Sequence, residues 1–252
     1  MSWTDRLFLF SPLDFAALAL LVGLWLAIGW RIENPSPSRP SVSRLMSQYR
    51  RDWMVQMMTR QPRIFDAQTL STLRQGTSFF ASATMIAIGG ALAVVGNTER
   101  LTGLANQLTL EEDPAFVWEA KVLVVVAFLA NAFLKFVWSH RLFGYCAVLM
   151  AATPNNPEDP VAPARAAQAA EINIFAARGF NRGLRSVYFA LGATAWLLGA
   201  GALIGAAVIT FAVLWRREFA SQSRLVLMRG DTLPATRHRD MRGPEPEGIA
   251  RR

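Results

Sequence analysis

Two sets of polar side chains lie where this chain could bind or move a charged ligand. Asn131 and Lys135 are four residues apart, within the third of four long apolar runs. A helix would place them on one face, and an ionisable group inside such a run is a candidate functional site. The alternative is that the Lys135 ammonium extends to the membrane surface while its alkyl stem stays in the apolar layer.

Arginines form the second set. On a helix, Arg178, Arg182 and Arg185 share one face. Glu171 lies on the same face, and Arg141 ends the third apolar run nearby. Guanidinium groups bind phosphate or carboxylate through paired hydrogen bonds, so the cluster is a candidate site for a lipid phosphate or another anion. The alternative is a charge rim that only sets orientation in the membrane.

The sequence has few residues that could form a metal site, a catalytic triad or a phosphate-binding loop. Cys146 is the only cysteine, and His140 and His238 are the only histidines, which are too few ligands for a Cys/His zinc site. There is no Ser/His/Asp arrangement and no phosphate-binding loop motif. We therefore expect no metal and no cofactor. The enzyme question stays open, and a protein without catalytic activity is favoured.

The four apolar runs predict an all-α, polytopic bundle of transmembrane helices with additional cytoplasmic amphipathic helices. Each run approaches or exceeds the roughly 20 residues that cross a bilayer. Tryptophans near the ends of the runs match the aromatic belts at membrane surfaces, and Ser11-Pro12 suits the start of the first helix. The predicted spans cover residues 13–30, 77–95, 116–138 and 186–215.

The fourth run is unusually long, with no charge from Ser186 to Trp215. As one helix it would measure about 45 Å. A hairpin about Gly199 would leave legs of roughly 21 Å, which are too short to cross a hydrocarbon core of about 30 Å. We therefore predict a single crossing. Gly201 and Gly205, four residues apart, are predicted to let another helix pack closely.

Charge between the runs predicts the topology. Residues 31–76 and 139–185 carry more arginines than acids, whereas residues 96–120 are rich in acids. Cytoplasmic loops are enriched in Lys and Arg, so the first two segments are predicted to be cytoplasmic and the third external. Four crossings then place both termini outside. The tail conflicts with this, because nine arginines follow Trp215.

The spans and one further helix form a single predicted membrane domain over residues 1–230, and a tail follows it. Residues 42–60 have apolar side chains at helical spacing, with arginines mostly off that face. This pattern is typical of a helix lying in the membrane interface. The open alternative is a helix packed on another cytoplasmic segment. Residues 231–252 are rich in proline, arginine and glycine and are predicted to be a disordered tail.

The chain has a net charge of +8, which indicates an anionic partner. The basic residues flank the apolar runs, and this placement favours attraction to anionic lipid headgroups rather than to nucleic acid. The lipid bilayer is the first expected partner. A second copy of the chain or another membrane protein is also possible from the small-residue faces. The expected location is a membrane crossed several times, which we take to be the bacterial inner membrane.

Five short motifs in order support a family resemblance. They are Arg63-Ile64-Phe65-Asp66-Ala67, Ser78-Phe79-Phe80-Ala81-Ser82, Arg141-Leu142-Phe143-Gly144-Tyr145, Phe180-Asn181-Arg182-Gly183-Leu184-Arg185 and Arg217-Glu218-Phe219-Ala220-Ser221. Over roughly residues 45–228 the chain resembles the multi-pass membrane proteins of the domain of unknown function 599 family. Gly144 departs from the asparagine expected there. The resemblance implies several spans and supplies no activity or site.

The leading function hypothesis is a non-enzymatic membrane protein that acts as a scaffold, an assembly component or a lipid- or partner-binding component. A small oligomeric transporter or channel is the alternative, and it depends on Asn131 and Lys135 lining a shared pathway. A membrane enzyme acting on lipid headgroups is the third hypothesis. These hypotheses differ in where the polar side chains must gather, which depends on the tertiary structure.

Overall fold

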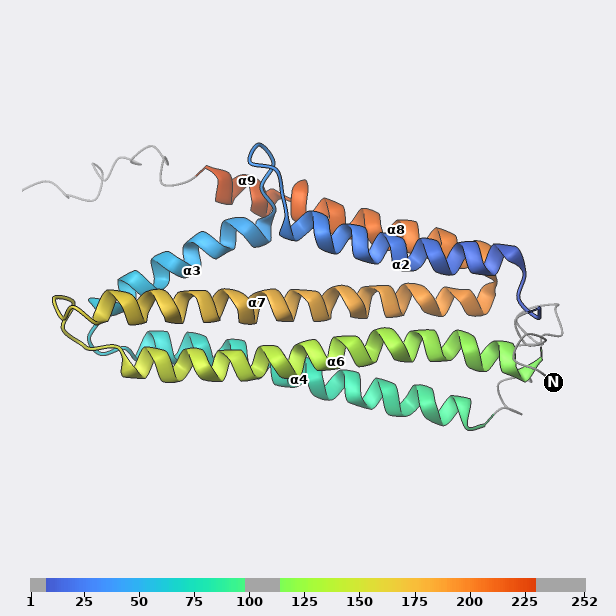
Figure 1. Cartoon of the computed structure of the whole chain (residues 1–252), viewed down its shortest axis with the longest axis horizontal. Coiled ribbons are helices and arrows are strands. Elements are labelled where there is room, and N and C mark those ends of the chain that lie inside the picture. Colours follow the sequence, from blue (N-terminus) through green and yellow to red (C-terminus); the bar gives the residue numbers. More distant parts are fainter. Residues whose placement is uncertain (1–7, 98–113, 230–252) are drawn as a thin grey trace, which may run out of the picture.

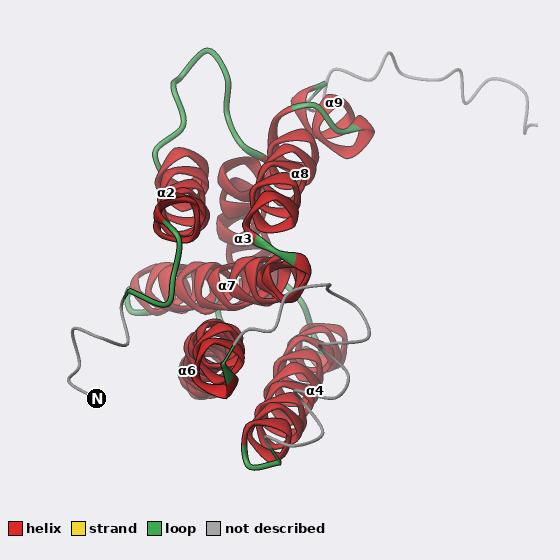
Figure 2. Cartoon of the chain, turned by 90° about the vertical axis from the view of Figure 1, so that its right-hand side faces the viewer, coloured by secondary structure: helices red, strands yellow, loops and turns green. Residues whose placement is uncertain are grey.

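A computed structural model describes residues 8–97 and 114–229, and all its regular elements in these ranges are helices (Figure 1). Figure 2 shows α7 between two pairs of helices, with α2 and α8 on one side and α6 and α4 on the other. The elements are α2 (Pro12–Glu33), α3 (Val42–Met58), α4 (Ile64–Val95), α6 (Ala115–Ala152), α7 (Ala162–Ala193), the 3-10 helix η1 (Thr194–Leu198), α8 (Ala200–Phe219) and α9 (Gln222–Met228).

Within the described residues, four helical segments are long and apolar enough to cross a membrane: Pro12–Glu33, Ile64–Val95, Ala115–Ala152 and Ala200–Met228. The all-α membrane bundle predicted from the sequence is confirmed, and the chain is a multi-pass membrane protein. The first three predicted spans lie within α2, α4 and α6. The predicted tail, residues 231–252, lies outside the described residues.

The prediction of one continuous helix over residues 186–215 is wrong. The helix that contains Ser186 ends at Ala193, η1 follows, and the chain reverses at Gly199, whose φ is +107°. Glycine adopts positive φ without the clash that a Cβ would cause. The length of roughly 21 Å for the first leg of a hairpin assumes that this leg begins at Ser186. That leg is instead the end of α7, whose 32 residues measure about 48 Å.

The hairpin changes the position of the C-terminal segment. Because α8 runs antiparallel to α7, its end lies beside the end of α2 and the start of α3 (Figure 1). Arg216 and Arg217, in the last turn of α8, therefore lie at the same end of the bundle as the arginine-rich segments 31–76 and 139–185. The conflict between the tail and the positive-inside rule disappears.

This arrangement predicts the accessibility of single cysteines, introduced in a Cys146→Ser background. In intact cells, an impermeant thiol reagent is expected to label Asn97→Cys, at the opposite end of the bundle. Ser38→Cys and Ser223→Cys are expected to react only after permeabilisation, because arginine-rich ends stay cytoplasmic. Labelling of Ser223→Cys but not Ser38→Cys in intact cells would contradict the prediction that both residues lie on the cytoplasmic side.

The bundle has two hydrophobic cores along its length. One lies among the spans and includes Leu21, Phe189 and Leu203. The other lies among α3, the start of α4, the second half of α6 and the first half of α7, and it includes Met57 and Phe143. Because α6 has 38 residues, or about 57 Å, it extends well past a hydrocarbon core of about 30 Å. The C-terminal part of α6 and the N-terminal parts of α4 and α7 meet in this second core. By length they extend past the membrane, and we call them the helical extension.

The amphipathic helix over residues 42–60 is α3, and it packs on this extension. Met54 and Met57 are fully buried in the second core, and α3 runs obliquely along α7 (Figure 1). A helix lying in the interface would present this apolar face to lipid. The structure therefore favours the open alternative, a helix packed on another segment of the same chain, over the interfacial helix.

The opposite end of the bundle is closed by local and tertiary contacts. Ser11 caps α2 through a capping box with Asp14, as its place before Pro12 indicated. The same carboxylate accepts a 2.6 Å hydrogen bond from the indole nitrogen of Trp196 in η1. Asp14 therefore both caps the first span and anchors the turn of the hairpin.

Candidate functional site

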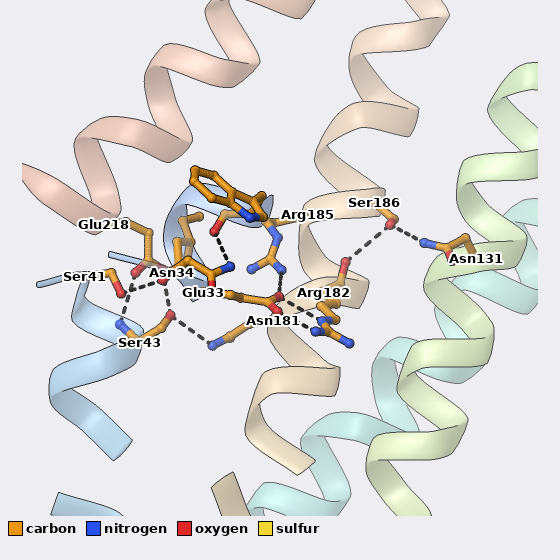
Figure 3. Close-up of polar contacts among 12 residues, drawn as sticks. Glu33, Asn34, Ser41, Ser43, Asn131, Asn181, Arg182, Arg185, Ser186 and Glu218 are labelled. Atoms are coloured by element: carbon orange, nitrogen blue, oxygen red, sulfur yellow. Dashed lines mark hydrogen bonds and ion pairs between the residues drawn. The ribbon is translucent and has the colours of Figure 1, made fainter. Parts of the chain in front are cut away.

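A cluster of ion pairs lies where α2 ends against α7 (Figure 3). Glu33 is the last residue of α2, and its carboxylate contacts two arginines one helical turn apart on α7. The distance from Arg182 Nε to Glu33 Oε1 is 2.8 Å, and the second carboxylate oxygen accepts from Arg182 Nη2. Arg185 Nη2 lies 2.7 Å from Glu33 Oε1. One carboxylate thus holds two guanidinium groups.

These two ion pairs differ in burial. The side chain of Arg185 is 8% exposed, whereas that of Arg182 is 44% exposed. A buried guanidinium needs a compensating charge, because desolvation disfavours an isolated ion. Glu33 therefore makes the burial of Arg185 possible, and its pair with Arg182 contributes less because water screens it.

A second set of hydrogen bonds joins α8 to the start of α3. The Glu218 carboxylate accepts from the Ser43 backbone N–H and from the Ser43 hydroxyl, each at 3.1 Å. Ser41 caps α3 and donates a 2.8 Å hydrogen bond to the carbonyl of Ile32. A carboxylate at a helix N-terminus is favourable. Glu218 therefore occupies the anion position that the first turn of α3 would otherwise offer.

These contacts surround a cavity of about 280 Å³, which we call the arginine cavity. Its lining comes from α2, α3, α7 and α8, and it contains five arginines against two glutamates. The glutamates are Glu33 and Glu218, and both are already engaged. The arginines are Arg44, Arg50, Arg178, Arg185 and Arg217.

Three of the five arginines have partners in the protein. Arg185 pairs with Glu33, Arg50 donates to the side-chain oxygen of Asn173, and Arg217 donates to the Tyr188 hydroxyl. Burial lowers the pKa of the Arg50 guanidinium, because a low-dielectric surrounding disfavours the charged form. These three arginines are thus held in place by groups of the protein itself.

The other two arginines have donors to spare. In the described part of the chain, neither Arg44 nor Arg178 has a side-chain hydrogen bond or ion pair, and Arg178 only lies near the Phe175 ring, 5.6 Å from its centroid. Each guanidinium carries five N–H donors. Arg44 and Arg178 can therefore bind an anion without breaking an existing contact.

Asn131 and Lys135 line a different space, the lateral cavity, between α2, α6 and α7. Trp25 and Trp30 also line it, and so do Glu33, Arg182 and Arg185. Asn131 donates a 2.7 Å hydrogen bond to the Ser186 hydroxyl. The two sets of candidate residues thus meet at Glu33, which lines both cavities.

Arg141 does not join the predicted cluster. It is exposed on α6 and lines neither cavity, and its Nε lies 3.1 Å from the Tyr145 hydroxyl. The structure brings together Arg178, Arg182 and Arg185, as their spacing on one helix indicated. Glu33 and Glu218 were not predicted, because their partners lie 152 and 175 residues away in sequence.

The glycines predicted to pack helices make no such contact here. A Cβ added at Gly201 or Gly205 would have no neighbouring heavy atom within 4 Å. Close packing occurs instead on α7, where a Cβ at Gly183 would lie 2.6 Å from the Phe136 ring and one at Gly179 would lie 3.5 Å from Ser139. These glycines are also four residues apart, so the small-residue motif operates between α7 and α6.

Comparison with known families identifies one match. The family model described as "Protein of unknown function, DUF599" matches residues 16–223. The chain belongs to this family. No curated protein and no solved structure matches it. Two of the five motifs that suggested DUF599, residues 180–185 and 217–221, contribute to the arginine cavity of this family member.

Proposed function

We propose that this DUF599 protein is a non-enzymatic membrane protein that binds the phosphate group of an anionic ligand in the arginine cavity. The observation that carries the proposal is the excess of arginines there, with Arg44 and Arg178 free of hydrogen bonds and ion pairs among the described residues. Guanidinium groups match phosphate oxygens in geometry and charge. The glutamates do not compete, because Arg185 and the start of α3 engage them.

The position of the cavity favours a lipid headgroup as the source of the phosphate. Its lining on α2 consists of Ile32 and Glu33, two and three residues after Trp30, and tryptophans mark the headgroup level at the end of a span. The arginine-rich end is the predicted cytoplasmic side, where anionic lipids attract basic residues. We take the membrane to be the bacterial inner membrane, and the role to be that of a lipid-binding scaffold.

The test compares lipid and soluble phosphate on the purified full chain in nanodiscs of neutral lipid. Exchanging part of the lipid for phosphatidylglycerol is expected to raise the apparent Tm, because a ligand that binds only the folded state stabilises it. The double variant Arg44→Gln/Arg178→Gln is expected to lose most of this rise. Inorganic phosphate in the millimolar range is expected to have little effect.

The matched control is Arg141→Gln/Arg216→Gln, which also removes two charges. Both side chains are exposed, and Arg216 lies at the same end of α8 as the cavity without lining it. If this control loses as much of the rise as Arg44→Gln/Arg178→Gln, the attraction is a general surface effect and the site is wrong. A rise with inorganic phosphate equal to that with lipid would identify a soluble ligand instead.

A further inference from the structure

A third space, the α4–α6 cavity, lies in the helical extension, away from the arginine cavity. Its volume is about 350 Å³, within the range of small-molecule sites. The helices that form it, α4 and α6, lie side by side in Figures 1 and 2. Met57, Leu70 and Met150 line it together with alanines, and its lining contains two arginines and no acid.

The first arginine, Arg63, is largely engaged by the end of α6. Its guanidinium donates to the carbonyls of Thr153 at 2.7 Å and of Pro154 at 2.6 Å, which satisfies acceptors that a helix end leaves open. Its Nε is buried and has no partner. Arg63 therefore closes one end of the cavity and still presents one unsatisfied donor.

The second arginine, Arg74, is the free one. Its Nε is also buried without a partner, and no ion pair or hydrogen bond to its guanidinium occurs in residues 8–97 and 114–229. The nearest acid along α4, Asp66, is buried against Trp53 and Arg60 instead. A buried donor without an acceptor is costly, so a ligand that brings an acceptor would relieve it.

We propose that the α4–α6 cavity binds a fatty acid, with its carboxylate on Arg74 and its acyl chain along the apolar lining toward Arg63. The two arginines are eleven residues apart, or about 16 Å along the helix. Apolar walls with the unpaired Arg74 guanidinium and no acid suit an amphipathic anion and disfavour a cation. This site is independent of the phosphate site proposed above.

The test is photo-crosslinking of the full chain in nanodiscs with a dodecanoate that carries a diazirine near the end of its chain. Because the diazirine lies at the chain end, adducts mapped by mass spectrometry are expected near Arg63, on residues 63–67 and 150–155. Excess dodecanoate is expected to compete, and dodecyltrimethylammonium is not. Adducts on the spans, formed from the bilayer, serve as the internal reference for the amount of probe.

Three variants decide the role of the charge. Arg74→Gln is expected to weaken binding about tenfold, the usual loss for one charge-assisted hydrogen bond, whereas Arg74→Lys should retain most of it. Arg141→Gln, an equal charge change on the neighbouring helix, should leave it unchanged. Equal labelling of Arg74→Gln and the wild type, competition by the cation, or adducts confined to the spans would each overturn the proposal.

Discussion

Gly183→Ala is expected to destabilise the protein by about 1–3 kcal/mol, the usual cost of overpacking a close contact. A Cβ at this position would lie 2.6–2.9 Å from three atoms of the Phe136 ring. Phe136 is fully buried and packs against the rings of Phe80 and Phe180, at centroid distances of 5.5 and 5.4 Å. The neighbouring rings therefore restrict how far the Phe136 ring can move.

The matched control is Gly205→Ala, in which the new Cβ has no neighbouring heavy atom within 4 Å. Alanine is the better helix former by about 0.5–1 kcal/mol, so this variant should be as stable as the wild type or slightly more. The measurement is the apparent Tm in detergent. Phe136→Leu combined with Gly183→Ala should lose less than the sum of the single variants. Equal Tm values for the two glycine variants would contradict the contact between α6 and α7.

Glu33→Gln is expected to destabilise the protein by about 3 kcal/mol, because it leaves a buried charge without compensation. The Arg185 side chain is 8% exposed, and Glu33 is its ion-pair partner. The control is Glu171→Gln, which removes the partner of Arg51 where both side chains are at least 40% exposed. Exposed pairs contribute about 0–1 kcal/mol, so the control should change little.

A second substitution separates charge compensation from simple loss of a contact. Adding Arg185→Met to Glu33→Gln removes the stranded charge, and the double variant should recover most of the lost stability. Apparent Tm values of the four proteins, measured in the same detergent, give the answer. If Glu33→Gln and Glu171→Gln lower the Tm equally, the ion pair at the end of α2 is not a buried one in solution.

Features set by near neighbours were predicted correctly. The first three spans follow from runs of apolar residues, since each peptide group in a membrane must find its hydrogen bond within its own helix. The start of α2 follows from Ser11 and Asp14, which are three residues apart. The face that gathers Arg178, Arg182 and Arg185 follows from helical periodicity. Each of these depends on residues within a few helical turns.

The arginine cavity depends on contacts between distant segments, which no local sequence pattern predicts. Pairing of Glu33 with Arg185 requires the end of α2 to meet the middle of α7, and pairing of Glu218 with Ser43 requires the hairpin to return α8 to the same end. The hairpin was missed because the length of its first leg depends on how far α7 extends into a charged segment. The glycine motif on α7 was missed because it needs the Phe136 face of α6 opposite it.

The amino-acid sequence by itself determined that this chain crosses a membrane several times as helices, which of its ends carries the arginines, and which residues of α7 share a face. Hydropathy and helical periodicity depend on residues that are close in sequence, so the sequence alone is enough to predict them. The tertiary structure alone decided the reversal at Gly199, the two cavities that meet at Glu33, and the arginines left with free donors. These are properties of surfaces brought together from distant segments, where burial and charge pairing depend on what lies opposite.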